Sequence, residues 1–463
     1  MFSVVSRASP QSGRIAPQMD HIARKKKRMT PFQTIILGFA AVVLVGALIL
    51  MLPISSAQGN FTPFHEALFT STSAVCVTGL VIHDTGTYWS YFGKSVILLL
   101  IQVGGLGVIT VAASFALLSG RKISLLQRST MQEAIAAPKV GGIVRLTGFI
   151  LKATFLMEFA GAVAMMPVFI KDHGPSGIFM AFFHSVSAFC NAGFDVMGKS
   201  SGAFSSLTSY SSSIVINVVI MLLIIIGGIG FLTWEDVYTN KFHLKRYRMQ
   251  SKVIFTVTGI LILLPAVFFF IFDLSDLPMK ERILGSFFQA ITPRTAGFNT
   301  YDLTALSGVG KAIMIALMLI GGSPGSTAGG MKTTTLAVLF ASTAAVFSRQ
   351  EEPHMFGRRI ENHVVRYASA ILIMYITLFS IGAMLISGID KVPIDKCFFE
   401  TASAVGTVGL SQGITPSLSV GSHIILMVLM FLGRVGGLTV IFAAISGNHP
   451  RMSKLPQERI TVG

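Results

Sequence analysis

Long apolar runs alternate with short polar connections along the 463 residues of this chain. A helix that crosses a bilayer needs about 20 predominantly apolar residues, and the runs fall into pairs that enclose a shorter segment. The pattern therefore predicts eight membrane-spanning helices in four pairs, with one inserted segment inside each pair. The helices are expected at 31–54, 92–119, 145–170, 212–238, 250–273, 310–347, 363–387 and 421–446, and the inserted segments at 62–80, 176–194, 279–298 and 394–410.

The inserted segments repeat one sequence frame, which is clearest in Phe399-Glu-Thr-Ala-Ser-Ala-Val-Gly-Thr-Val-Gly409. Each has a Phe ten residues before a Gly, and successive Gly positions are 114, 104 and 112 residues apart. A repeat of this length holds more than one helix, so we predict four helix–insert–helix units. The units are expected at 31–120, 145–238, 250–347 and 363–446, between an N-terminal tail 1–30 and a C-terminal tail 447–463. The other frames are Phe69 to Gly79, Phe183 to Gly193 and Phe287 to Gly297; Ser73, Ser187 and Ser403 align within the frames, and Ile291 breaks that series.

Composition excludes a soluble globular protein, because 52% of the residues are hydrophobic, only 12% are charged and the mean hydropathy is +0.71. The net charge of +16 could suit nucleic acid, but its placement fits membrane orientation better, and no nucleic-acid partner is expected. The tails and the connections 121–145, 239–252 and 349–366 carry 24 Lys and Arg, against 9 on the side of the inserts. Cytoplasmic loops carry the excess of Lys and Arg. We therefore expect a multi-pass protein of the cell membrane with both termini in the cytoplasm and the inserts entering from outside.

Catalytic and metal-binding patterns are not found in the sequence, and no enzyme activity is expected. Cys76, Cys190 and Cys397 lack CxxC or zinc spacing, which favours small packing residues over a redox role. Gly325 to Gly330 has the spacing of a phosphate-binding loop, but Met331 intervenes before the Lys-Thr pair and no soluble strand precedes it. We expect no nucleotide on this chain.

A Pro stands upstream of the Gly in each inserted segment and suits the first turn of a helix. Each insert therefore predicts a helix of about 10–13 residues, too short to span, followed by an extended Gly-containing strand. Such backbone survives at membrane depth only where it is buried in protein or lines a wet cavity. Four inserts at one depth should therefore face one axis. The prolines are Pro63, Pro175, Pro278 and Pro393.

The chemistry of these segments points to an alkali cation. The C-terminal end of a helix carries partial negative charge, and rings of backbone carbonyls can replace the hydration shell of a dehydrated cation. No carboxylate falls within the Gly-containing strands that end the segments, which disfavours a divalent-cation site. Packing of Phe and Gly in a symmetrical bundle is the alternative. We predict that K⁺ is bound by the backbone carbonyls of Val77, Thr78, Gly79, Asn191, Ala192, Gly193, Thr295, Ala296, Gly297, Thr407, Val408 and Gly409.

Three stretches resemble the Trk/Ktr/HKT superfamily of potassium transporters: Ser403-Ala-Val-Gly-Thr-Val-Gly-Leu410, Ile291-Thr-Pro-Arg-Thr-Ala-Gly-Phe-Asn-Thr300 and Gly321-Gly-Ser-Pro-Gly-Ser-Thr-Ala-Gly-Gly-Met-Lys-Thr-Thr-Thr335. The chain looks most like the KtrB-type membrane subunit. The resemblance implies an all-α integral membrane protein of four pseudo-fourfold M1–pore-helix–M2 repeats with four re-entrant pore loops around one K⁺ path. It also implies a homodimer docked on a KtrA-like cytosolic ring of nucleotide-binding regulatory subunits. In this family a Gly in all four filters goes with K⁺ preference, and all four frames end in Gly here.

The second helix expected in the third unit contains a segment that cannot remain regular helix. Residues 321–330 hold five Gly, one Pro and two Ser. We predict an intramembrane loop below the filter; a Gly-rich packing surface is the alternative. The resemblance implies that this loop is a gate, with Lys332 in it or at its cytoplasmic end. The gate residues are Gly321, Gly322, Ser323, Pro324, Gly325, Ser326, Thr327, Ala328, Gly329, Gly330 and Lys332, together with Arg434.

Few charged residues fall within the predicted helices. An intramembrane Arg is costly and usually faces the bundle interior, so Arg434 is predicted to lie beneath the filter, where its charge opposes cations and holds the loop. A structural Arg bonded to carbonyls is a compatible alternative. Glu158, near Lys152, is interpreted as a structural carboxyl rather than a coupling-ion site. Four acidic residues near the outer mouth either raise the local cation concentration or form a solvated loop face: Asp84, Asp195, Asp302 and Glu400.

The function stays open between three hypotheses: a K⁺-uptake subunit, a Na⁺-selective or Na⁺/K⁺-coupled carrier of the same fold, and a membrane anchor without a conduction path. The sequence does not decide whether transport depends on Na⁺. The basic connections 239–252 and 349–366 are candidate docking surfaces for the cytosolic ring, although contact with membrane lipids explains them equally well.

Overall fold

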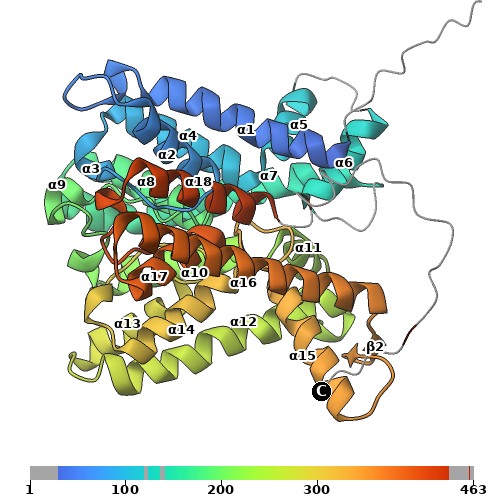
Figure 1. Cartoon of the computed structure of the whole chain (residues 1–463). Coiled ribbons are helices and arrows are strands. Elements are labelled where there is room, and N and C mark those ends of the chain that lie inside the picture. Colours follow the sequence, from blue (N-terminus) through green and yellow to red (C-terminus); the bar gives the residue numbers. More distant parts are fainter. Residues whose placement is uncertain (1–29, 119–123, 136–140, 437–438, 440–457, 459–463) are drawn as a thin grey trace, which may run out of the picture.

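Helices from the whole length of the chain form one bundle (Figure 1). The computed structural model describes residues 30–118, 124–135, 141–436, 439 and 458. The secondary structure of this part is helical apart from one short hairpin. The tails predicted at 1–30 and 447–463 lie outside the described residues, except for Thr30 and Glu458.

The first helix of every predicted unit is long and apolar enough to cross a membrane, and a shorter helix follows it. Each shorter helix begins directly after one of the four prolines at which the sequence predicted a helix to begin, which confirms that prediction. The first helices are α1 Pro31–Leu50, α7 Ile143–His173, α12 Met249–Phe268 with η4 Phe269–Asp273, and α16 Asn362–Asp390. The shorter ones, called insert helices here, are α2 Phe64–Val75, α8 Ser176–Phe189, α13 Met279–Ile291 and α17 Ile394–Gly406.

The second helices were predicted as continuous in three units, and this is wrong for 92–119 and 212–238. The structure breaks them at Gly107 and Gly230, into α4 Tyr91–Leu106 with α5 Val108–Leu118, and α10 Ile214–Gly228 with α11 Phe231–Asn240, the latter pair bent by 98°. In the fourth unit α18 Val420–Val435 ends before Gly436, and most of 437–446 lies outside the described residues. The three glycines have φ of 86°, 94° and 87°, which an L side chain rarely adopts, so the helix cannot continue through them.

The third unit is interrupted more widely, since α14 Gly308–Leu319 and α15 Thr333–Phe347 flank a loop at 320–332. The remaining elements are short and lie in the connections. They are η1 Pro53–Ser55, α3 Thr85–Tyr88, α6 Leu125–Ile135, α9 Gly198–Ser201, η2 Thr208–Tyr210, η3 Leu244–Arg246, η5 Leu303–Ala305, η6 Thr415–Ser417, and the antiparallel strands β1 His354–Met355 and β2 Arg358–Arg359.

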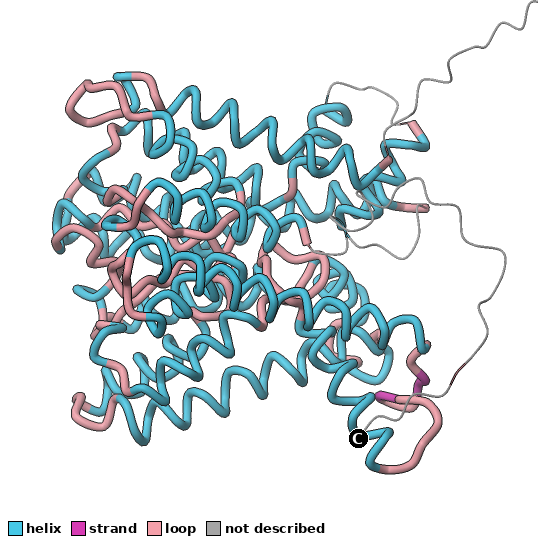
Figure 2. Tube along the Cα trace, in the orientation of Figure 1, coloured by secondary structure: helices cyan, strands magenta, loops and turns pink. Residues whose placement is uncertain are grey.

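The four units are joined in a closed ring by their second helices. Each second helix packs against the insert helix of its own unit and against that of the next unit: α4 against α2 and α8, α10 against α8 and α13, α14 against α13 and α17, and α18 against α17 and α2. The last contact closes the ring, because α18, red in Figure 1, returns to the blue start of the chain. Loop segments lie between the helices in the interior of the bundle (Figure 2).

Candidate functional site

The four frame glycines form a ring of backbone contacts. A Cβ built on each would fall against the carbonyl oxygen of the residue before the frame glycine of the next unit, at 2.5 Å for Gly79 and 2.7 Å for Gly193. All four have positive φ, between 67° and 93°. A side chain at any of them is therefore opposed both by backbone conformation and by lack of space. The contacts run Gly79 to Ala192, Gly193 to Ala296, Gly297 to Val408 and Gly409 to Thr78.

The segments before these glycines are not the extended strands that the sequence predicted. The residue two places before each Gly is left-handed, with φ of 58° at Val77, 59° at Asn191, 70° at Thr295 and 53° at Thr407. This conformation costs roughly 1–2 kcal/mol per residue and persists only where the surroundings enforce it. The enforcing bonds come from the ends of the insert helices, for example Thr78 N–H to Ser73 O at 2.8 Å. The non-Gly members of the twelve predicted residues are at most 1% exposed.

In the third unit the buried phenylalanine of the insert helix stands nine residues before the glycine instead of ten, so the predicted frame Phe287 to Gly297 is wrong on the helix side. Phe288 is fully buried, like the frame phenylalanines of the other units, whereas Phe287 is 38% exposed. Thr292 then stands where the other units have Ser, and its hydroxyl donates to Phe298 O as the hydroxyl of Ser187 donates to Phe194 O. The Ser/Thr position is therefore present in all four units, and neither Ile291 nor Thr292 breaks the pattern.

One side of the glycine ring opens into a cavity of about 440 Å³, called the mouth cavity here. All four frame glycines line it, and so do Asp84, Asp195 and Asp302. Burial raises the pKa of Asp195 to about 7. The fourth predicted mouth residue, Glu400, is fully buried behind the cavity wall. The described part of the chain holds no cluster of three or more His, Cys, Asp or Glu that could bind a metal ion.

The loop at 320–332 lies against the other side of the glycine ring. A Cβ on Gly329 would fall on the Thr407 hydroxyl, and one on Gly330 would lie 3.1 Å from Gly406 O. The loop folds on itself through Gly321 N–H to Met331 O at 2.8 Å. Lys332, which precedes α15, donates from Nζ to Ala328 O and Gly329 O at 2.8 and 3.3 Å. The Lys332 ammonium group thus bonds to two backbone carbonyls of the loop that precedes it.

Residues of the second unit hold the loop from the side. Ser323 N–H donates to Gly228 O at 2.9 Å, and the Thr327 hydroxyl donates to Phe189 O, at the end of α8, at 3.0 Å. Phe231 N–H donates to Gly325 O at 2.6 Å across the break between α10 and α11. The loop is therefore bonded at the end of α8 and at the break between α10 and α11, both in the second unit.

Arg434 connects this loop to the first unit. Its guanidinium donates to Thr327 O in the loop and to Gly104 O and Gly105 O at the end of α4, the last at 3.0 Å. No carboxylate pairs with it among the described residues. Arg434, Lys332 and Ala328 line a cavity of about 310 Å³ on this side, together with Gly105 and Gly330. Arg434 thus bonds to backbone carbonyls and holds the loop through the same hydrogen bonds, as the two compatible interpretations of this residue expected.

A second repeat, which the sequence analysis missed, marks these breaks. Each second helix contains a Gly followed six residues later by a Thr. In three units a Cβ on that Gly would fall against a carbonyl at the end of the insert helix, and in the third unit against Gly329 O in the loop. A search for short motifs outside the inserts would have found it. The copies are Gly104-Gly-Leu-Gly-Val-Ile-Thr110, Gly227-Gly-Ile-Gly-Phe-Leu-Thr233, Gly321-Gly-Ser-Pro-Gly-Ser-Thr327 and Gly433-Arg-Val-Gly-Gly-Leu-Thr439.

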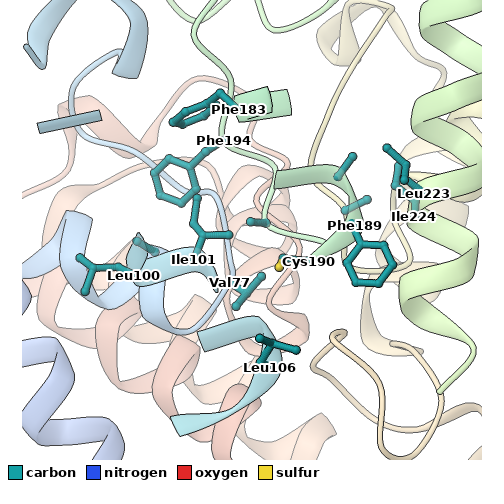
Figure 3. Close-up of a cluster of buried hydrophobic side chains, with 14 of the residues drawn as sticks. Val77, Leu100, Ile101, Leu106, Phe183, Phe189, Cys190, Phe194, Leu223 and Ile224 are labelled. Carbon is teal, nitrogen blue, oxygen red and sulfur yellow. The ribbon is translucent and has the colours of Figure 1, made fainter. Parts of the chain in front are cut away.

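Glu158 lies in a buried pocket behind the second insert rather than on the glycine ring. Its backbone carbonyl accepts from the Ser185 hydroxyl at 2.5 Å, and the Cys190 sulfur lies 3.8 Å from its carboxyl. Figure 3 shows Cys190 on the side facing Val77, among the apolar side chains that pack the first and second units together. Cys76, Cys190 and Cys397 are all buried and unpaired, which fits a packing role.

Comparisons with known proteins agree with this architecture. Residues 14–454 match the family model TrkH, described as a cation transport protein. The chain is 37% identical over 452 residues to the potassium/sodium uptake protein NtpJ of Enterococcus hirae, covering 95% of this chain and 99% of that protein. It is 36% identical to the Ktr system potassium uptake protein B of Bacillus subtilis, covering 90% and 93%. The potassium transporter TrkH from Vibrio parahaemolyticus has the same fold, with a TM-score of 0.69 at 19% identity over 90% and 86% of the two chains. The chain belongs to the TrkH family of cation transport proteins.

Proposed function

We propose that this protein takes up K⁺ across the cell membrane along the axis of its four units. The observation that carries the proposal is the closed ring of frame glycines, in which every glycine touches a neighbouring carbonyl. Eight buried residues lead into this ring, two from each unit, and carbonyl rings of this kind select dehydrated alkali cations. The relatives named for potassium or potassium/sodium uptake support the same assignment.

The loop at 320–332 serves as the gate of this path. It lies against the filter on the side away from the mouth cavity, and Arg434 fixes it to the first unit. A permanent positive charge beneath a cation filter also raises the barrier for the ion itself. Movement of the loop requires the Arg434 bonds to break, so this residue controls opening.

The membrane arrangement is part of the proposal. The four first helices are long and apolar enough to cross the bilayer, and the second helices supply the other four crossings of the proposed eight. The distribution of Lys and Arg supports a cytoplasmic place for both termini. Three relatives are named as Ktr system potassium uptake proteins, which supports work with further components of such a system. We propose that the chain forms a homodimer and that the component is a cytosolic nucleotide-binding partner. The basic segments 239–252 and 349–366, on the cytoplasmic side in this arrangement, are the docking surfaces.

A Na⁺-linked function is the second candidate, because one relative is named a potassium/sodium uptake protein. Two forms are distinguished by measurement: Na⁺ as a competing transported ion, and Na⁺ as a required partner of K⁺ uptake. Flux of K⁺ measured with and without Na⁺ separates them.

The test is ion flux into liposomes that contain the purified protein. The expected result is K⁺ flux at least tenfold above Na⁺ flux, and loss of this preference in Gly79→Ser, because the added side chain pushes against Ala192 O. Gly59→Ser is the matched control, since Gly59 also has positive φ, at 72°, but has open space around it. Equal fluxes of both ions in the wild-type protein, or unchanged selectivity in Gly79→Ser, would refute the filter.

A further inference from the structure

Every insert helix carries a buried polar side chain directly after its frame phenylalanine. These four residues are at most 1% exposed although apolar neighbours surround them. Buried polar groups are nearly always hydrogen-bonded, so each should have a specific partner. They are Thr70, His184, Gln289 and Glu400.

Glu400 has the most complete set of partners of the four. The Ser411 hydroxyl donates to one carboxylate oxygen, and the Thr415 hydroxyl donates to the other at 3.0 Å. The backbone amides of Gln412 and Ile414 also face the carboxylate. A single carboxylate therefore holds the whole turn that follows the fourth frame glycine. Burial raises the pKa of Glu400 to about 7, and the four donors that converge on this one carboxyl group fix the turn.

This turn forms part of the wall of the mouth cavity. Ser411, Gln412, Gly413 and Thr415 line the cavity next to Gly409. Glu400 itself does not line it, so its action on an ion must pass through the turn. The turn is also tied to the first unit through His423. Thr415 O accepts a hydrogen bond from His423 Nε2 at 2.9 Å, and the His423 ring packs on Phe69 of the first unit, with 5.1 Å between the ring centroids.

In the second and third units the same position holds the mouth segment less firmly. In the second unit, His184 Nδ1 donates to Met180 O of its own helix at 2.8 Å, and its only bond toward the mouth among the described residues is a long one, from Val196 N–H to Nε2 at 3.5 Å. In the third unit, neither end of Gln289 has a protein hydrogen-bond partner within the described part of the chain. The fourth unit is thus the one in which this position of the insert helix holds the mouth turn; in the first unit Asp84, outside the insert helix, accepts from Thr87 and from Phe204 N–H instead.

We propose that Glu400 is a positioning residue that sets the affinity of the mouth for the transported cation, by holding the turn at 411–415 beside Gly409. The inference rests on the proposed function, because it needs a cation to pass through the mouth cavity. It assigns Glu400 a role distinct from the general attraction of cations by acidic residues: the carboxylate acts through geometry rather than through its own contact with the ion.

Uptake kinetics of Glu400→Gln in cells that lack other K⁺ uptake systems test this assignment. The amide keeps the size of the side chain but places an NH₂ group against donors. We expect the KM for K⁺ to rise at least threefold, with Vmax within twofold of wild type after correction for membrane abundance, and Na⁺ to inhibit more strongly. Asp395→Asn is the matched control, because Asp395 is an exposed acid on the same helix, and it should leave KM unchanged.

Ser411→Ala and Thr415→Val keep the inference testable if Glu400→Gln fails to accumulate, since each removes one bond to the carboxylate. Both should raise KM in the same direction, and Thr415→Val should add little to Glu400→Gln because the two act through one contact. Wild-type KM and Na⁺ inhibition in Glu400→Gln, or a fall in Vmax alone, would overturn the inference. Absence of K⁺ uptake by the wild-type protein would instead refute the proposed function.

Discussion

The third unit differs from the other three on both sides of its frame glycine. Its insert helix reaches the glycine with one residue fewer, since Gly297 follows Thr292 by five positions whereas Gly79, Gly193 and Gly409 follow their Ser by six. Its second helix opens into a loop of 13 residues, 320–332, where the first two units have a single break. The glycine ring nevertheless closes through all four units.

This comparison separates two parts of the molecule. The ring keeps fourfold geometry because each glycine is constrained by the next, so a change in one unit would disturb all of them. The loop on the other side of the ring comes from the third unit, and it is held by bonds to the second unit at Gly228 O and Phe189 O and to Arg434 of the fourth. Selection of the ion is therefore expected to depend on all units, and gating on the third.

The largest effect expected from a test of this comparison concerns the register of α13. Phe288→Ala empties a fully buried site and should destabilise the protein by about 3–5 kcal/mol, while Phe287→Ala, at a side chain 38% exposed, should cost far less. Phe69→Ala in the first unit should match Phe288→Ala. Thermal unfolding of the purified variants in detergent measures the difference. If Phe287→Ala destabilised the protein more than Phe288→Ala, the frame predicted from the sequence, Phe287 to Gly297, would be correct.

The second effect concerns the ring itself. Gly297→Ala places a Cβ against Val408 O at a φ of 80°. We expect K⁺ uptake to fall at least tenfold, and Gly193→Ala to fall similarly although the two units differ in spacing. Uptake per amount of protein in the membrane is the measurement, with Gly59→Ala as the control for φ alone. Normal uptake in Gly297→Ala would show that the third unit stands outside the filter.

Much of this arrangement was predictable from the sequence, and the failures have physical causes. Hydropathy identified the first helices, and the prolines identified the insert helices, because both signals are local. The frame of the third unit failed because Phe287 and Phe288 are adjacent and only burial distinguishes them. Spacing to Gly297 favoured the wrong one, since it assumed that no residue was lost in between.

The breaks and the backbone of the filter could not be predicted in the same way. Gly107 and Gly230 lie inside apolar runs, where hydropathy averages them with their neighbours. Left-handed Val77 and Thr407 contradict local preference, and their conformation accompanies backbone bonds to the end of their own insert helix, which residue preferences do not reveal. The interior place of Arg434 was predictable from cost alone, but its carbonyl partners come from the first and third units.

The third effect tests whether gating belongs to the third unit. Arg434→Ala removes the bonds to Thr327 O, Gly104 O and Gly105 O together with the positive charge. We expect initial K⁺ uptake to rise severalfold while the preference for K⁺ over Na⁺ stays, because the ring is untouched. Arg434→Lys keeps the charge without the planar set of donors and should give a smaller rise. Unchanged uptake at normal abundance would remove the gate role.

The smallest effect concerns the hydroxyl of the Ser or Thr near the C-terminal end of each insert helix. Thr292→Val and Ser187→Ala each remove a hydroxyl that donates to the carbonyl just after the frame glycine, at Phe298 and Phe194. Each should lower the free energy of unfolding by about 1 kcal/mol, the net worth of one such bond, if the shorter third unit uses the position as the second does. Thr343→Val is the control, because that exposed hydroxyl bonds only within α15 to Leu339 O. If Ser187→Ala lowers the free energy of unfolding and Thr292→Val does not, the two positions are equivalent in geometry but not in energy. The third segment would then be anchored by its backbone bonds to Thr292 O, from Ala296 N–H and Gly297 N–H, and not by the hydroxyl.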